Sequence, residues 1–309
     1  MTYAPVALFV YNRPWHTRQT IEALLANVEA PETPLYIFSD APKNVSANKA
    51  VAEVRAYISS IVGFKSVSIA IREINFGLAH TLIDGVSSVC EQHGRVIVLE
   101  DDLVTSPYFL KFMNEGLDKY QDDQRVISIH GYVYPLKPVL PETFFLKGAD
   151  CWGWATWKRG WDLFDPDGQK LLDELKSRKL GHQFDFGGCY PYTKMLQAQI
   201  AGKNNSWAIR WYASAFLNDK LTLYPGRSLV HNIGADGSGT HCSETKDFSS
   251  ELAQTPIAVR DISVEESLNA KQLFAEFHKR TRPSLPVRVA NKVFSQIQRI
   301  RRSGYGKQI

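Results

Sequence analysis

Three consecutive acids, Glu100, Asp101 and Asp102, directly follow the short apolar run at residues 96–99. An unbroken apolar run is typical of a strand buried on both faces, and ligands bind at the carboxyl ends of such strands in an α/β sheet. Three adjacent carboxylates repel one another unless a divalent cation or basic groups supply positive charge. The position and the chemistry together indicate a site for a metal ion and a nucleotide.

The chain before residue 131 alternates between strand and helix patterns. Helical spacing of apolar residues predicts helices at residues 17–28, 46–62, 80–93 and about 107–120. Short β-branched or apolar runs predict strands at residues 6–11, 35–39, 67–74, 96–99 and 126–130. This alternation predicts right-handed βαβ units, and therefore an α/β fold with a mostly parallel sheet flanked by helices.

Polar residues gather where the predicted strands end, at the rim where such sheets bind nucleotides. Besides the three acids they are Asn12, Arg13, Asp40 and residues 75–77. Asp40 is equally suited to a turn before Ala-Pro. Neither Gly-x-Gly-x-x-Gly after the first strand nor Gly-x-x-x-x-Gly-Lys-Ser/Thr occurs in the sequence, which disfavours a dinucleotide dehydrogenase and a P-loop NTPase.

The second half of the chain is rich in aromatic residues. Four of the seven tryptophans lie between Trp152 and Trp161. An indole packs well against the C–H face of a sugar ring, so we expect Trp152 or Trp154 to contact a ligand while other members of the group lie in the core. Residues 232–241 are rich in glycine and polar residues, which suits a mobile lid.

Two helices are predicted near the C-terminus. Residues 263–266 form a capping-box pattern that opens a helix through about Lys279. Residues 287–302 place apolar residues on one face with basic residues around them. Such a helix can lie on an anionic membrane surface, or it can pack on the protein with its charges in solvent.

Composition predicts an ordinary globular protein. The chain has 309 residues, 44% of them hydrophobic and 22% charged, and a net charge of +4 that is too small to imply nucleic-acid binding. The four cysteines are far apart, and we expect free thiols in a reducing cytoplasm. Since no signal peptide or bilayer-spanning segment is recognised, a cytoplasmic protein is expected, with possible peripheral attachment to the inner face of the plasma membrane.

From Val6 to Cys242 the chain resembles GT-A-fold glycosyltransferases, in particular N-acetylglucosaminyltransferase I and bacterial surface-polysaccharide glycosyltransferases. The resemblance is carried chiefly by Glu100-Asp101-Asp102, which is similar to a variant of the metal-binding Asp-x-Asp motif. It implies a Rossmann-like GT-A domain at residues 1–260, with a nucleotide-sugar half (1–135) and an acceptor half (136–260), followed by a basic helical tail (261–309). It also implies a metal-dependent hexosyl- or N-acetylhexosaminyltransferase of surface-polysaccharide synthesis.

The resemblance also implies roles for individual residues. Asp102 would ligate Mn²⁺ or Mg²⁺ at the donor diphosphate, Asp101 would face the ribose, and Glu100 would face the transferred sugar. The donor would be a nucleotide sugar, with a UDP-sugar favoured, and the acceptor a glycan or a lipid-linked oligosaccharide. The remaining residues implied to contact the donor or the acceptor are Asn12, Arg13, Asp40, Arg72, Asn75, Gly77, Trp152 and Trp154.

The chain departs from the family at the general base. The corresponding helix start, at residues 207–211, has no acid. Asp150, Asp236 or His241 could serve as the base, or the reaction could be a retaining one; inversion is favoured without being settled. The missing acid also keeps open a catalytically inactive nucleotide-binding scaffold. A sugar nucleotidyltransferase is a further alternative, although no glycine-rich basic loop follows the first strand.

Overall fold

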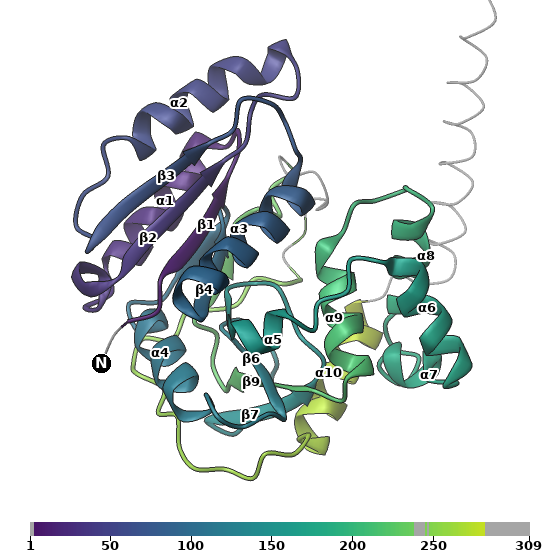
Figure 1. Ribbon diagram of the computed structural model, residues 1–309. Coiled ribbons are helices and arrows are strands. Elements are labelled where there is room, and N and C mark those ends of the chain that lie inside the picture. The colour runs from purple at the N-terminus through teal and green to yellow at the C-terminus, as the bar shows by residue number, and fades with distance from the viewer. Residues whose placement is uncertain (1–2, 238–244, 246, 282–309) are drawn as a thin grey trace, which may run out of the picture.

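The computed structural model describes residues 3–237, 245 and 247–281, and Figure 1 shows their arrangement. An eight-stranded sheet lies at the centre, in the order β3-β2-β1-β4-β8-β6-β9-β7. The strands β1 to β4 are parallel to one another, and β6 and β9 are also parallel to each other. In the same order, the strands span Ser66–Ile71, Pro34–Ser39, Val6–Val10, Arg95–Glu100, Trp154–Trp157, Val126–His130, Leu221–Pro225 and Thr143–Lys147.

Helices cover both faces of this sheet, because side chains alternate between the faces along each strand. On β1, Val6, Leu8 and Val10 pack against α1 (Pro14–Leu25), α2 (Asn48–Ile58) and α4 (Phe109–Lys119). Ala7 and Phe9 point to the other face, toward α3 (Leu78–His93). The mostly parallel α/β sheet flanked by helices that the sequence predicts is therefore confirmed.

The strand β8 is the main element that the sequence did not predict. It runs antiparallel between β4 and β6, and its residues Trp154 to Trp157 are buried. Trp154 is completely buried, with its ring against those of Trp161, Trp207 and Trp211. The expected ligand contact of Trp154 is therefore corrected, since this side chain belongs to the core.

The remaining helices lie in the second half of the chain. They are α5 (Lys158–Trp161), α6 (Gly168–Ser177), α7 (Gly181–Phe184), α8 (Tyr192–Ile200), α9 (Trp207–Leu217) and α10 (Leu268–Thr281), with short 3-10 turns at Ala30–Glu32 and Val45–Ala47. A separate pair of antiparallel strands, β5 (Leu103–Thr105) and β10 (Val230–Asn232), lies beside the acid motif. None of the helices among the described residues is long and apolar enough to cross a membrane.

The helix α10 begins later than the sequence predicts. Ser267, not Ser263, lies at its start, where its Oγ accepts a hydrogen bond from Ala270 N at 3.3 Å. Residues 263–266 instead run along β7, with a bridge between Phe145 and Glu266. Near the other end of α10, the ring of Phe277 stacks on that of Tyr134 at 4.5 Å. The helix at residues 287–302 lies outside the described residues.

Candidate active site

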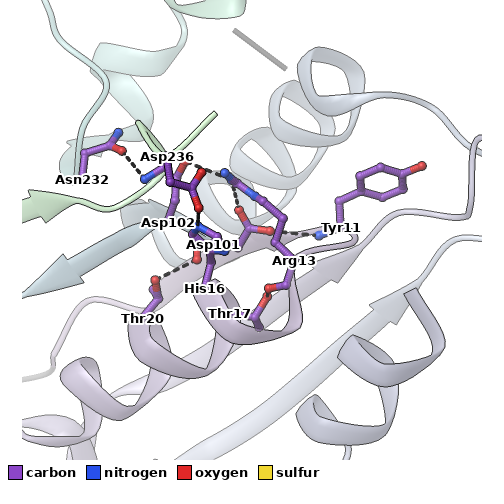
Figure 2. A network of polar contacts seen from close by, with 10 residues as sticks. Tyr11, Arg13, His16, Thr17, Thr20, Asp101, Asp102, Asn232 and Asp236 are labelled. Atoms are coloured by element: carbon purple, nitrogen blue, oxygen red, sulfur yellow. Dashed lines mark hydrogen bonds and ion pairs between the residues drawn. The ribbon is translucent and has the colours of Figure 1, made fainter. Parts of the chain in front are cut away.

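The acid motif is organised by one guanidinium group. Arg13 immediately precedes α1, whose first residue is Pro14, and Asp101 and Asp102 lie in the turn between β4 and β5. The Nη2 atom of Arg13 donates to Oδ1 of Asp101 and, at 2.9 Å, to Oδ2 of Asp102 (Figure 2). Thr20 Oγ1 donates to the backbone oxygen of Asp101 at 2.9 Å. The first helix therefore fixes the turn that carries both acids.

Negative charge exceeds positive charge in this cluster. Glu100, the last residue of β4, precedes Asp101 and Asp102, and Arg13 forms ion pairs with Asp101 and Asp102. Burial raises the pKa of the Glu100 carboxyl, and the negative charges of Asp102 and Asp101 raise it further. Burial also raises the pKa of Asp101, against the opposing effect of Arg13. The cluster is thus suited to a further cation bound through oxygen ligands.

Arg13→Ala is expected to destabilise the fold by about 3–5 kcal/mol, because it leaves the buried Asp101 carboxylate without its partner. Asp101 is only 4% exposed. Urea unfolding measures the change in the free energy of unfolding. Arg125→Ala is the matched control, since the Arg125 side chain is 63% exposed in its ion pair with Asp123 and its loss should cost far less stability. Equal losses in the two variants would contradict this prediction.

The segment after β10 packs directly on the acids. Ile233 N donates to the backbone oxygen of Asp102 at 2.9 Å. A Cβ atom on Gly234 would lie 2.0 Å from Oδ2 of Asp102, so a larger residue would displace that carboxylate. Asp236 is exposed and its Oδ2 lies 3.1 Å from His16 Nε2 on α1 (Figure 2). Asp236 is thus held beside α1, on the same side of the segment as Arg13. His241 lies outside the described residues.

The carboxylate of Asp40 uses its acceptor positions in hydrogen bonds within the protein. Its Oδ1 accepts hydrogen bonds from the backbone N–H groups of Ala41 and Phe76, at 2.9 and 3.0 Å. Its Oδ2 accepts from the Asn75 side chain at 3.1 Å and from Gly77 N at 2.8 Å. A carboxylate offers about four acceptor positions, so all of them are used. We therefore assign to Asp40 the task of holding residues 75–77, in place of the expected contact with the nucleotide.

The other two residues expected on the nucleotide side differ in their surroundings. Arg72 forms an ion pair with Asp84 on α3, and its guanidinium lies over the ring of Phe76 at 5.1 Å. Within the described part of the chain, no contact joins it to the acid motif. Asn12 is half-buried in the turn between β1 and α1, next to Arg13. Of the two residues, only Asn12 lies close to the acid motif, because it is bonded to Arg13.

A second feature is a cavity of about 340 Å³ with aromatic walls, here called the aromatic cavity. Six tyrosines, Trp152 and three phenylalanines contribute to its lining. The ring of Trp152 packs edge-on against Tyr132 at 4.7 Å, so this tryptophan forms part of the cavity wall, whereas Trp154 lies in the core. The aromatic residues that line the cavity are Tyr132, Tyr134, Trp152, Phe186, Tyr190, Tyr192, Tyr212, Tyr224, Phe248 and Phe274.

Asp150 is the one acid among the described residues that line the aromatic cavity. Its side chain is 31% exposed, its Oδ1 accepts from Cys151 N at 2.8 Å, and its Oδ2 lies 3.7 Å from His130 Nε2. Ala208, at the helix start where the acid is missing, also lines the cavity. Of the two base candidates that the structure describes, Asp150 lines the aromatic cavity and Asp236 does not.

The two features adjoin each other through the segment after β10. Gly234 packs on Asp102, and the next residue, Ala235, lines the aromatic cavity. A phosphate-type ligand at Arg13 and a sugar in the cavity would therefore lie on either side of one short segment. Arginine suits a phosphate because its planar N–H groups match the oxygens, and aromatic faces suit a sugar ring.

Sequence reasoning missed His130 and the tyrosine wall. His130 ends β6, which is parallel to β4 within the mixed sheet, so a polar residue at that strand's carboxyl end was an available signal. The tyrosines Tyr190, Tyr192 and Tyr212 come from two helices and a loop. These tyrosines meet only through tertiary packing, so no local sequence pattern predicts that they line one cavity.

A comparison with family models finds no match for the sequence, and a comparison with curated proteins finds none either. Similar solved structures include S. aureus TarS 1-349 (11% identity, 75% of this chain and 61% of that chain, TM-score 0.39). The same protein in complex with UDP-GlcNAc is similar at 10% identity, over 73% and 57% of the two chains, with a TM-score of 0.39. The present chain thus spans about three fifths of the TarS structures.

A third similar structure is the mannosyltransferase PcManGT from Pyrobaculum calidifontis in complex with GDP-Man and Mn²⁺. It is 11% identical, over 71% of this chain and 70% of that chain, with a TM-score of 0.40.

Proposed function

We propose that the protein is a metal-dependent glycosyltransferase that transfers a sugar from a nucleotide-sugar donor to a glycan or lipid-linked acceptor of a surface polysaccharide. The observation that carries this proposal is the juxtaposition of the Arg13–Asp101–Asp102 cluster with the aromatic cavity across the segment at Gly234 and Ala235. A charged rim suits a nucleoside diphosphate, and the adjoining aromatic cavity suits a sugar.

The donor diphosphate would lie at Arg13 and the acid motif. Asp102, supported by Asp101, would hold a Mn²⁺ or Mg²⁺ ion, because these cations bind through one or two carboxylates together with substrate phosphates. The residues fit such an ion, since the carboxylates of Asp101 and Asp102 share one guanidinium and the side-chain ligands that they offer are oxygens. When bound, the ion supplies positive charge beside the leaving diphosphate, where Arg13 acts as well.

The acceptor would lie in the aromatic cavity with its hydroxyl at Asp150. As the new bond forms between the acceptor oxygen and the sugar C1, the bond from C1 to the phosphate oxygen breaks. The electron pair of that bond leaves with the nucleoside diphosphate. The acceptor proton passes to the Asp150 carboxylate, which suits an inverting reaction.

A panel of nucleotide sugars tests the proposal directly. The full chain is incubated with Mn²⁺ and UDP-glucose, UDP-N-acetylglucosamine, or GDP-mannose, and both thermal stabilisation and release of the nucleoside diphosphate are measured. We expect at least one donor to stabilise the fold and to be hydrolysed slowly in the absence of an acceptor. Binding without hydrolysis or transfer would instead favour the nucleotide-binding scaffold, and no binding at all would overturn the donor site.

The basic tail is expected to bring the enzyme to an anionic membrane. Residues 282–309 contain seven Lys or Arg residues and no Asp or Glu. Each basic residue near an anionic surface contributes about 1 kcal/mol. Removal of all residues after Pro286 should therefore abolish co-sedimentation with phosphatidylserine-containing vesicles while leaving donor binding unchanged. Vesicles of phosphatidylcholine alone are the control, and full retention on anionic vesicles would exclude the tail as the attachment.

A further inference from the structure

His130 is a completely buried histidine at the end of β6. Neither of its ring nitrogens has a hydrogen-bond partner within the described parts of the chain. A buried polar group without partners costs free energy that an apolar side chain of similar shape would not. The ring of Tyr224 packs edge-on against it at 4.9 Å, so the surroundings would accept a phenyl ring. The imidazole is therefore poorly explained by packing alone.

The nearest charged group to this imidazole is Asp150. His130 Nε2 lies 3.7 Å from Oδ2 of Asp150, which is longer than a hydrogen bond. A shift of about 0.7 Å would bring the pair within bonding distance, and such bonds commonly tighten when a substrate binds. The second oxygen, Oδ1, is already held by Cys151 N at 2.8 Å. One oxygen of the carboxylate is thus fixed by the backbone, while the other faces His130.

We propose that His130 is a positioning residue that donates its Nε2–H to Oδ2 of Asp150 and orients this carboxylate for the acceptor hydroxyl. The inference rests on the proposed function, because it takes Asp150 as the base. In the reaction the acceptor proton moves to Asp150 as the C1–phosphate bond breaks, and the nucleoside diphosphate carries away the electron pair. His130 keeps its own proton throughout and remains neutral.

The electrostatic surroundings are consistent with a neutral donor. Burial lowers the pKa of His130, opposed by the charge of Asp150, and burial lowers that of His278 on α10 to about 4. Burial raises the pKa of the Cys151 thiol and of the neighbouring tyrosine hydroxyls, so these groups stay uncharged at neutral pH. Lys147 pairs with Asp219. The tyrosines concerned are Tyr132, Tyr134, Tyr192, Tyr212 and Tyr224.

The sign of the pH effect follows from this arrangement. A hydrogen bond donated to the ionised carboxylate stabilises that form relative to the protonated one. Loss of the donor removes this stabilisation, so a higher pH is needed to keep the base ionised. The acidic limb of the activity profile should consequently move to higher pH when His130 cannot donate.

The test compares His130→Phe with His130→Gln, using UDP-glucose or UDP-N-acetylglucosamine hydrolysis, with water as the acceptor. In His130→Phe we expect the acidic limb of kcat/KM to move up by about one pH unit and kcat to fall about ten- to a hundredfold. In His130→Gln the side-chain amide can still donate, so the limb should stay close to that of the wild type. The Tm of His130→Phe should equal or exceed the wild-type Tm, because an unsatisfied polar group is removed.

Asp150→Asn separates failure of this inference from failure of the proposed function. If Asp150→Asn is inactive and His130→Phe has an unchanged limb, His130 does not position the base, although the base assignment stands. If Asp150→Asn hydrolyses the donor at the wild-type rate, the base assignment fails and the inference fails with it. His130→Leu replaces the phenylalanine variant if that variant does not fold, and an unchanged limb there likewise overturns the inference.

Discussion

Asp102→Ala is expected to abolish the stabilisation that UDP or GDP confers together with Mn²⁺. A ligand at a hundred times its Kd stabilises a protein by about 2.7 kcal/mol, which corresponds to about 5 °C in Tm for a chain of this size. The variant removes the carboxylate that would hold the cation, and it leaves Arg13 bound to Asp101 alone. The quantity compared is the ligand-induced change in Tm, so any loss of intrinsic stability cancels.

Asp118→Ala is the matched control for this experiment. Asp118 also forms an ion pair with an arginine of the β4 region, Arg95, but at the opposite end of the strand from the acid motif. Its removal should leave the ligand-induced change in Tm intact. If Asp102→Ala and the control respond alike to UDP and Mn²⁺, Asp102 does not hold the cation.

Asp150→Asn should lower kcat by about a hundred- to ten-thousandfold, the range typical for loss of a general base. Asparagine keeps the size of the side chain and can still accept from Cys151 N, so the local structure should persist. Donor binding, measured by thermal stabilisation, should be unchanged because the acid motif is untouched. Transfer or hydrolysis assays with saturating donor measure the effect on kcat.

Asp236→Asn is the informative comparison, because Asp236 is the other described base candidate. It is exposed and paired with His16, so we expect a much smaller effect on kcat. A large loss in Asp236→Asn together with a small one in Asp150→Asn would transfer the role of base to Asp236. That result would also move the acceptor to the donor side of the segment after β10.

The first half of the fold could be predicted because its signals are local. The strands β1, β2 and β4 are short and mostly apolar, β3 carries Val and Ile alternating with Ser and Ala, and the helix α2 carries apolar residues at helical spacing. The position of the acids at the end of β4 follows from the same reasoning. The pattern of residues within each short segment was therefore enough to predict the strands and helices of this half.

The second half was harder to predict because its signals are ambiguous. Aromatic residues suit both a sugar site and a core, and only packing separates Trp152, at the cavity, from Trp154, inside β8. The same holds for Asp40, where the four filled acceptor positions cannot be seen from the sequence. A carboxylate at a strand end can bind a ligand or hold a loop, and the fold decides between them.

The close fit of Gly234 against Asp102 has a kinetic consequence. Because Ala235 is bonded to Gly234 and forms part of the other wall, a molecule that moves the Asp102 side chain also reshapes the chamber next to it. The proposed donor and acceptor then would not enter independently, and steady-state measurements should display a compulsory sequence of addition. Gly234, where a side chain would displace Asp102, would thus determine the order in which the proposed substrates bind.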